Sequence, residues 1–471
     1  MSLRDRLERL RQLGLDPAAA PPRGPVEGTG SGAAQRPGCG AALEGPAGGA
    51  AARDHRAGAV LRALDLDTRL TPRGRVSFRE DAAPAHRPRG GAAPALLARV
   101  PLDPLLRFAR LEGQVDPAGV DPEDLVFLDT ETTGLAGGTG TLVVVAGLAR
   151  LQGDHLRIRQ FVLLDPADEA AFLAALAEDL AGARLLVTFN GRAFDWPVLE
   201  ARFVLNRQVG APPDLPHLDL LPAARRLYGA DLPSCRLTDL EAHVLGARRE
   251  ADIPGSEVPL RYHMLLDGRP EPFRPVLDHN RHDLETLAAL TAHAAYLSYR
   301  GLAGGEAPAG APPEPGPEAG PTQLLALARS CLERGRFRRA EQLLREALVQ
   351  AGAHRRGAAW FTAARLLSTL YRRQGRWNEA AALWSEIAAA YPPGAMWALT
   401  ELAKEREHRA RDLEAALRYT EQALELCRRR LLLGSLHGRR DLEALEHRRR
   451  RLMRRLGRAA ADPSPFSRPP F

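Results

Sequence analysis

The sequence LVFLDTETTG, residues 125–134, decides the fold of this chain. Four apolar residues followed by polar ones are typical of a buried strand that ends at a sheet edge. Further strands are expected at 141–151 (TLVVVAGLARL), 156–164 (LRIRQFVLL) and 184–190 (RLLVTFN). Helices are expected at 168–182, 194–208 and 278–300. Three strands in sequence, followed by alternating helix and strand, predict a mixed α/β sheet with helices packed on it.

Two acidic residues, Asp129 and Glu131, stand at the end of the first strand. Residues i and i+2 of a strand point to the same face, so these carboxylates should converge. Crowding two acids beside an apolar strand is costly unless a cation neutralises them. The alternative is that Asp129 caps a turn and Glu131 is solvated.

A second acidic position follows the strand at 184–190, in the sequence TFNGRAFDWP. Asn190 and Gly191 turn the chain, and Asp195 begins a helix whose first turn accommodates Pro197. Taken alone, Asp195 is more simply an N-cap. Asp219, after another short apolar run, is either a structural cap or a group on the substrate side.

The third acidic position lies in DHNRHD, residues 278–283, which is expected to open the last helix. His279 and Asp283 are i and i+4 and share one helical face. An imidazole beside a metal-bound carboxylate can orient a water molecule or accept its proton. A lone His–Asp pair on a helix is more often structural. Asp278 and His282 are expected to be capping and surface groups.

Together, DTETTG, FNGRAFDWP and HNRHD resemble the three motifs of the DnaQ-like exonucleases, which have the ribonuclease H fold. The arrangement is most similar to bacterial YprB-type proteins, which carry a tetratricopeptide-repeat (TPR) tail. HLDLLPAARRLYG and DIPGSEVPLRYH, between the second and third motifs, also resemble that family. The resemblance is strong over residues 100–300 and weaker over the repeats.

The resemblance implies a four-carboxylate (DEDD) site built from Asp129, Glu131, Asp195 and Asp283. These acids would hold two Mg²⁺ or Mn²⁺ ions, since hard divalent ions prefer oxygen ligands. His279 would orient or deprotonate the attacking water. In the relatives, the third motif has His five residues before its Asp, or Tyr four before. Here His279 stands four before Asp283, which puts its role in doubt.

The same resemblance implies residues that bind the terminal nucleotide. The glycine-rich loop 132–140 could bring backbone N–H groups close to it, although a plain flexible turn explains the glycines equally well. The expected substrate-binding residues are Thr132, Thr133, Gly134, Leu135, Asn190 and Phe194.

The chain divides by composition into six segments. A mostly disordered region, 1–58, precedes an extension of unknown role, 59–110, and the nuclease domain, 111–300. A Pro/Gly/Ala linker, 301–321, leads into TPR-like helical repeats, 322–430, and a basic helical tail, 431–471. The repeats align Phe337, Trp377 and Leu413, and also Ala340, Ala380 and Ala416.

Charge is distributed unevenly along the 471 residues. Residues 321–471 hold 30 Arg and Lys against 16 Asp and Glu, a net +14, so with a total of +7 the preceding part carries −7. A basic end suits nucleic-acid binding, but a merely solvated helical surface is an equal alternative. The four cysteines are scattered, which favours a reducing cytoplasm over zinc or disulfides. No apolar stretch is long enough for a membrane span.

The sequence therefore predicts a metal-dependent 3′→5′ exonuclease acting on nucleic acid with a 3′ end. The TPR region would dock a protein partner or the substrate. The rival hypothesis is a binding adaptor that keeps the nuclease fold as a platform and uses the repeats as its working surface. Endonucleolytic cutting on the same fold is a third possibility. Nothing in the sequence distinguishes DNA from RNA, because that choice depends on contacts to the 2′-OH.

Overall fold

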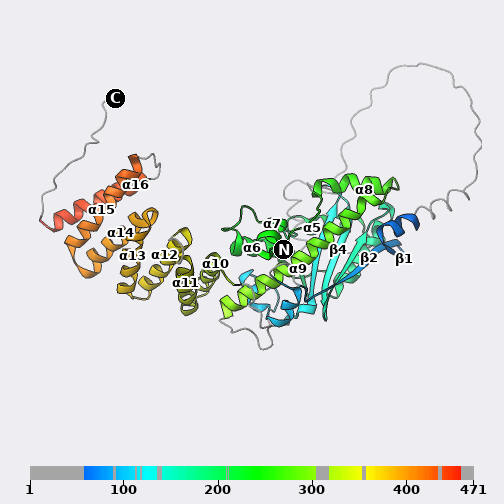
Figure 1. Cartoon of the computed structure of the whole chain (residues 1–471), viewed down its shortest axis with the longest axis horizontal. Coiled ribbons are helices and arrows are strands. Elements are labelled where there is room, and N and C mark those ends of the chain that lie inside the picture. Colours follow the sequence, from blue (N-terminus) through cyan, green and yellow to red (C-terminus); the bar gives the residue numbers. More distant parts are fainter. Residues whose placement is uncertain are drawn as a thin grey trace, which may run out of the picture. The chain divides into compact units, whose positions relative to one another are not determined.

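A computed structural model gives the structure of the chain (Figure 1). It describes residues 58–87, 92–111, 114–116, 119–134, 140–207, 209, 212–303, 318–352, 357–432 and 438–457. Almost all of the N-terminal region expected to be disordered, the middle of the linker (304–317) and parts of the basic tail (433–437 and 458–471) lie outside these residues.

Seven strands form one mixed sheet in the order β1-β2-β5-β4-β3-β6-β7. From β1 to β3 neighbouring strands run antiparallel, whereas β3, β6 and β7 run parallel. The strands are β1 (Asp67–Thr71), β2 (Gly74–Pro84), β3 (Leu125–Thr132), β4 (Val143–Gln152), β5 (His155–Val162), β6 (Leu185–Thr188) and β7 (His217–Asp219). The predicted mixed α/β sheet is confirmed.

Strand β3 lies inside the sheet and divides its side chains between two cores. Leu125 and Phe127 face the core that includes α9, whereas Val126 and Leu128 face the core that includes α4 and α5. Figure 1 shows α9 lying across the strands. The helices of this part are α3 (Asp103–Phe108), α4 (Glu169–Ala181), α5 (Asp195–Leu205), α6 (Leu220–Tyr228), α7 (Leu237–Leu240), α8 (Val258–Leu266) and α9 (Arg274–Ser298).

Short 3-10 and π turns connect these elements. They are η1 (Pro94–Arg99), η3 (Pro122–Asp124), η4 (Pro166–Asp168), η5 (Glu241–Leu245), η6 (Gly255–Glu257), η7 (Glu271–Phe273) and η8 (Tyr299–Ala303). The last helix, α9, begins at Arg274 rather than at residue 278, because Pro275 fits its first turn. The DHNRHD motif therefore lies inside the helix instead of opening it.

The segment 59–110, to which the sequence assigned no role, contributes two strands to the sheet. β2 pairs with β5 from Ser77 to Pro84, and β1 covers the outer edge of β2. Most side chains of β1 are exposed, which explains why no hydrophobic alternation marks it in the sequence.

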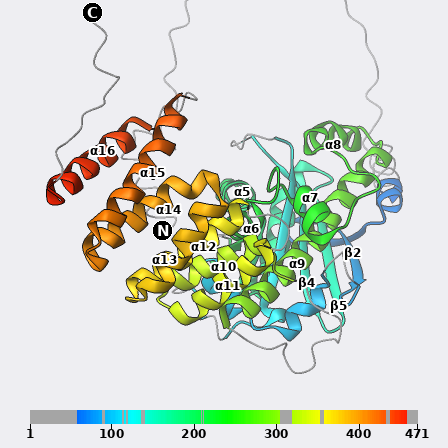
Figure 2. The ribbon, with the colours of Figure 1, turned by 60° about the vertical axis from the view of Figure 1, so that its left-hand side comes forward.

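The C-terminal part is entirely helical over its described residues, as predicted, and each helix packs against the next (Figure 2). The helices are α10 (Pro321–Glu333), α11 (Phe337–Gly352), α12 (Ala358–Arg373), α13 (Trp377–Ala390), α14 (Pro392–Glu405), the π turn η9 (Arg406–Ala410), α15 (Leu413–Leu432) and α16 (Gly438–Arg455). The aligned positions Phe337, Trp377 and Leu413 begin α11, α13 and α15. The aligned alanines are fully buried.

The basic run of α16 is anchored rather than wholly solvated. Glu407 in η9 is buried and accepts hydrogen bonds from Arg448, Arg451 and Arg455 of α16, at 2.5, 2.7 and 3.0 Å. Leu445 and Leu452 of the same helix are buried. These three arginines are therefore not free for another anion while α16 stays in place.

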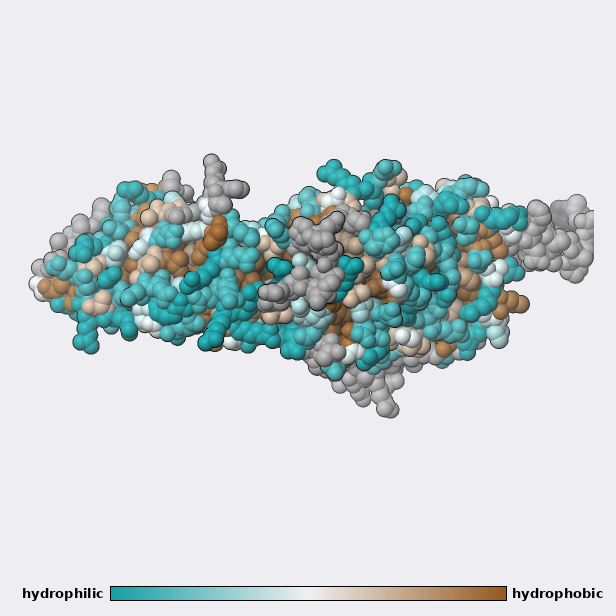
Figure 3. All heavy atoms as spheres, turned by 60° about the horizontal axis from the view of Figure 1, so that its bottom comes forward, coloured by the Kyte–Doolittle hydropathy of each residue, from teal (hydrophilic) through white to brown (hydrophobic). Residues whose placement is uncertain are grey.

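The face drawn in Figure 3 is mainly hydrophilic, with hydrophobic side chains scattered in small patches. None of the helices in the described residues combines the length and apolarity that a bilayer crossing would require.

Candidate active site

Asp129 and Glu131 project from β3 toward α9, on the same face as Leu125 and Phe127. Glu131 is 7% exposed. The turn-cap interpretation of Asp129 and the solvated interpretation of Glu131 are therefore both wrong. The alternation of the strand places the two carboxylates side by side, as the sequence predicted.

A buried amide fixes the orientation of Asp129. Asn280 on α9 donates from Nδ2 to Asp129 Oδ2 at 2.8 Å and to the Asp129 carbonyl at 3.1 Å. Gln160 on β5 donates from Nε2 to Asn280 Oδ1 at 2.9 Å and to the Leu277 carbonyl at 2.8 Å. The Asp129 carboxylate is thus held by Asn280 of α9, which is in turn held by Gln160 of β5.

Gly147 makes this close approach of α9 possible. On β4 it lies opposite Asp129 on one side and Gln160 on the other. A Cβ at this position would meet Asn280 Oδ1 at 2.1 Å and Leu284 Cδ1 at 2.7 Å. Any larger residue would push α9, and with it the third motif, away from the sheet.

Asp195 is the first residue of α5, and Phe194 occupies the N-cap position. Asp195 Oδ1 accepts hydrogen bonds from Thr130 Oγ1 at 2.5 Å and from Thr130 N at 3.1 Å. The simple N-cap interpretation of Asp195 is therefore wrong, since its carboxylate is joined to β3 between the two acids of the first motif.

Asp219 acts as a cap, which is one of the two roles expected for it. Its Oδ1 accepts from Leu221 N at 3.1 Å at the start of α6, and from Asn190 N at 2.7 Å. Asn190 is held in the left-handed region, at φ 65°, so the turn after β6 is fixed by this carboxylate.

His279 and Asp283 share the face of α9 that lies over Glu131. His279 Nε2 is 3.5 Å from Asp283 Oδ2 and 3.9 Å from Glu131 Oε1. The other ring nitrogen, Nδ1, donates to Asp252 Oδ1. Asp252, which sequence reasoning did not single out, thus sets the orientation of the imidazole. Asp278 lies 3.7 Å from Arg79 and is half exposed, in line with a surface role.

Arg249 is a second residue that sequence reasoning missed. Its guanidinium is 5% exposed, pairs with Asp283, and donates to Glu241 at 2.8 Å and to Asp252 at 3.1 Å. Those three carboxylates raise its pKa above the ordinary arginine value, although burial opposes the rise. No local signal marks Arg249, because its partners lie up to 34 residues away in the chain.

The carboxylates of the three motifs act on one another electrostatically. Burial, followed by the charges of Asp283, Glu131 and Asp195, raises the pKa of Asp129 well above its usual value. Burial and the charges of Asp283, Asp195 and Asp252 likewise raise the pKa of Glu131. Burial raises the pKa of Asp195, and the charge of Asp219 adds to the rise, against hydrogen bonds from Thr130. This cluster has an excess of negative charge that one arginine does not balance.

The donor set suits a hard divalent cation, because four carboxylates offer only oxygen ligands and their mutual repulsion is relieved by a positive charge. Across the described residues, no three Asp, Glu, His or Cys side chains are already gathered closely enough to hold an ion. Arg249 engages Asp283 in this arrangement. The residue types therefore fit a cation, but an ion would have to draw the carboxylates closer together and displace the guanidinium from Asp283.

The expected substrate-binding residues border this cluster only in part. Thr132 Oγ1 donates to the Gly134 carbonyl at 2.8 Å, and Thr133 Oγ1 accepts from Leu142 N at 2.9 Å, so both hydroxyls hold the loop. Leu135 lies outside the described residues. Phe194 is 57% exposed beside Asp195, where a stacking partner could reach it.

Two comparisons with known proteins show the family of this chain. The RNase H superfamily domain matches residues 126–295, which run from β3 into α9. The uncharacterized protein YprB of Bacillus subtilis (strain 168) is 32% identical over 309 residues, covering 65% of this chain and 70% of the relative. The RNase H-like fold supports a nuclease-type activity on nucleic acid, and nucleases of this fold generally use divalent metal ions. The chain therefore belongs to the YprB family, with an RNase H superfamily domain at its centre.

Proposed function

We propose that the chain is a metal-dependent 3′→5′ exonuclease of the four-carboxylate type. The observation that carries this proposal is the electrostatic coupling of Asp129 to Glu131, Asp195 and Asp283, which come from β3, α5 and α9. A protein without use for a cation at this place would have no reason to keep four buried or half-buried acids within reach of one another's charge.

Asp129, Glu131, Asp195 and Asp283 would hold the ions, with Mg²⁺ or Mn²⁺ as the candidates. Bound there, divalent ions would make water more nucleophilic and stabilise charge on the leaving 3′ oxygen. Asn280 and Thr130 keep Asp129 and Asp195 in place by the hydrogen bonds described above. Binding of an ion would require Asp283 to leave Arg249 and the acids to move closer together.

His279 is proposed to orient the attacking water and accept its proton. Because Nδ1–H is donated to Asp252, the lone pair of the imidazole is on Nε2, which faces Glu131 and Asp283. A water between these groups would meet an acceptor for its proton at Nε2. This arrangement favours the base role for His279 despite the unusual spacing of the motif.

Arg249 is proposed to act as the counter-charge of the resting site. Its pairing with Asp283, Asp252 and Glu241 balances part of the negative charge when no ion is bound. Release of Asp283 would leave the guanidinium on the other two carboxylates. The same residue therefore sets how strongly an ion must compete for Asp283.

We also infer that residues 322–430 form TPR-like repeats that dock a protein partner or substrate. The helix-starting positions of Phe337, Trp377 and Leu413, and the full burial of Ala340 and Ala380, support this interpretation. β1 and β2 belong with the nuclease domain in this proposal, because they extend its sheet.

The test incubates the full chain with 5′-labelled single- and double-stranded DNA and RNA, with Mg²⁺, Mn²⁺ or EDTA. We expect a ladder that shortens from the 3′ end and that EDTA, Asp129→Ala or Asp283→Ala abolishes. Asp154→Asn, an exposed carboxylate on the β4–β5 turn, is the matched control and should cut normally.

Cutting by the Asp129→Ala protein at the wild-type rate would refute the proposal. Internal fragments in place of a ladder would indicate endonucleolytic cutting. A chain that never cuts, and that shows no specific heat on titration with Mn²⁺, would instead be the adaptor.

A further inference from the structure

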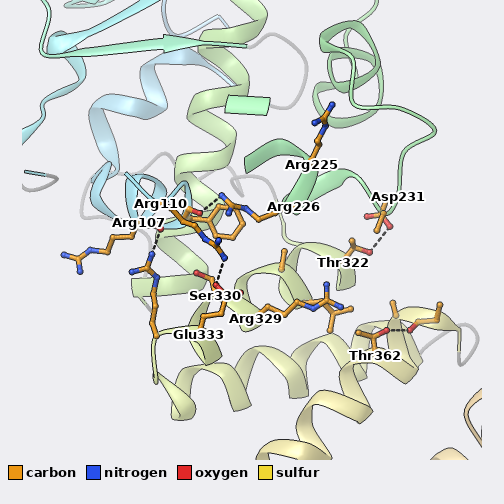
Figure 4. A pocket seen from close by; sticks show the side chains of 17 residues that line it. Arg107, Arg110, Arg225, Arg226, Asp231, Thr322, Arg329, Ser330, Glu333 and Thr362 are labelled. Atoms are coloured by element: carbon orange, nitrogen blue, oxygen red, sulfur yellow. Dashed lines mark hydrogen bonds and ion pairs between the residues drawn. The ribbon is translucent and has the colours of Figure 1, made fainter. Parts of the chain in front are cut away.

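A cleft of about 580 Å³ lies where the nuclease part meets the helical part (Figure 4). Its walls come from the end of α3, the last turns of α6, and helices α10 and α12. Six arginines line it against two acids, Asp231 and Glu333. They are Arg107, Arg110, Arg225, Arg226, Arg329 and Arg334.

The positive charge of this cleft is only partly compensated. Glu333 pairs with Arg110 at 3.0 Å, and Asp231 accepts from Thr322 Oγ1 at 2.7 Å. Arg225 and Arg329 are exposed, and neither has a carboxylate within ion-pair distance among the described residues. Two arginines of the cleft are thus available to an anion.

Arg226 lies in the wall of the cleft, near other arginines. Its guanidinium lies 4.8 Å from the centre of the Phe108 ring and donates to the Phe108 carbonyl at 2.6 Å, while its buried Nε has no partner. Figure 4 shows Arg110 and Arg226 close together, reaching in from different elements. Burial, then the charges of Arg110 and Arg334, lower the pKa of Arg226. An anion in the cleft would relieve this repulsion.

The cleft is connected to the acidic cluster by α6. That helix begins at its cap Asp219, whose charge acts on Asp195, and carries Arg225 and Arg226 near its other end. Six residues of helix span about 9 Å. A single strand that ends at the carboxylates would reach the cleft within a few nucleotides.

We propose that this cleft binds the phosphate backbone of the single strand whose 3′ end lies at the four carboxylates. The inference rests on the proposed function for the direction of the strand. Guanidinium groups match phosphate oxygens in geometry and charge, and the cleft offers no row of aromatic side chains for base stacking. Binding through the phosphate backbone alone would be independent of the base sequence of the strand.

The test measures fluorescence anisotropy of 5′-labelled single strands with the full chain in EDTA, so that the strand stays uncut. The variant is Arg225→Gln/Arg329→Gln, and the matched control is Arg338→Gln/Arg418→Gln, two exposed arginines on α11 and α15. Dinucleotides and strands of about fifteen nucleotides are compared, because only the longer strand extends from the carboxylates into the cleft, and its length lies within the site sizes common for single-strand binding.

We expect the cleft variant to bind the longer strand about tenfold more weakly, with a salt slope shallower by about 1.4, because each lost phosphate contact accounts for ~0.7. Binding of the shorter strand and of both strands to the control variant should change little. Equal loss in the control, or no loss in the cleft variant, would overturn the inference.

Two further outcomes separate the cleft from the exonuclease. If the wild-type chain shortens strands in Mn²⁺ and the cleft variant binds them normally, the cleft assignment fails and the exonuclease stands. If the wild-type chain never cuts but the cleft variant loses the longer strand, the cleft stands alone. If the cleft variant binds a labelled polyglutamate peptide more weakly than the wild type but still binds the strand normally, the assignment is overturned in favour of an acidic protein segment.

Discussion

Carboxylates in two regions of this molecule have opposite electrostatic surroundings. Around β3, Asp129 and its neighbours repel one another, and their pKa values rise. In the helical part, Glu407 is surrounded by Arg448, Arg451 and Arg455. Burial would raise its pKa too, but hydrogen bonds and charge from Arg451 and Arg448 outweigh burial and lower it. A carboxylate that is paired with arginines stabilises the fold, whereas carboxylates that repel one another favour the binding of a cation.

The largest expected effect is at the first motif. Asp129→Asn should lower exonuclease kcat/KM by about 10³-fold or more, equivalent to roughly 4 kcal/mol of transition-state stabilisation. The stability of the metal-free protein should stay the same or rise, because one of four repelling charges is gone. Steady-state kinetics and thermal melting in EDTA measure the two effects. If Asp129→Asn loses activity only because the protein unfolds, the proposed difference between the acids around β3 and Glu407 is contradicted.

The helical group should show the reverse pattern. Glu407→Gln leaves three arginines without their carboxylate and should destabilise the docking of α16 by about 3 kcal/mol, the lower end for breaking a buried ion pair. Hydrogen exchange across 438–457 should speed up, while activity per folded molecule on a short strand should not change. Glu443→Gln, exposed on the same helix, is the control. Unaltered exchange in the Glu407 variant would show that the arginines do not anchor α16.

Arg249 resembles the arginines around Glu407 but lies in the other region, where it pairs with Asp283, one of the mutually repelling acids. Arg249→Met should free Asp283 and tighten Mn²⁺ binding about tenfold, or roughly 1.4 kcal/mol, measured by calorimetry and by the Mn²⁺-induced rise in Tm. Arg248→Met, an exposed neighbour, should match the wild type. Weaker Mn²⁺ binding in Arg249→Met would mean that the guanidinium supports the ion site.

The smallest expected effect is a pH dependence of opposite sign in the two regions. Asp129 has a raised folded pKa, so its contribution to stability is complete below 3.8 and is lost as pH rises through the raised value. Glu407 has a lowered folded pKa, so its contribution is present above 4.5 and is lost as pH falls below that. Hydrogen exchange of β3 and of α16 in EDTA, each followed over pH, should therefore change in opposite directions. Parallel profiles would contradict the contrast.

Much of the fold could be predicted from the sequence because continuous apolar runs mark the buried strands around β3. Pro197 and the turn before it placed the start of α5, and its acid, within one residue, whereas the helix ends at Leu205 rather than at residue 208. β1 could not be predicted, since an exposed edge strand has no apolar face to mark it. For α9, Pro275 was an available signal for the earlier start.

The candidate site was only half predictable for a different reason. Its four acids and His279 stand in motifs with local spacing. By contrast, Asp252, Arg249 and Gln160 contribute through contacts made across the folded chain. Their residue types are common, and they reach the site only because α9 packs against the sheet.

The gap left by Gly147 carries one more consequence. Asn280 reaches Asp129 across 151 residues of sequence, and it does so only when α9 has settled into that gap. A ribosome-bound chain that has emerged as far as β4 possesses the first pair of acids but not the other half of the centre. Such a fragment lacks Asp195, Asp283 and the Asn280 anchor, so the proposed hydrolytic centre cannot assemble before α9 has left the ribosome.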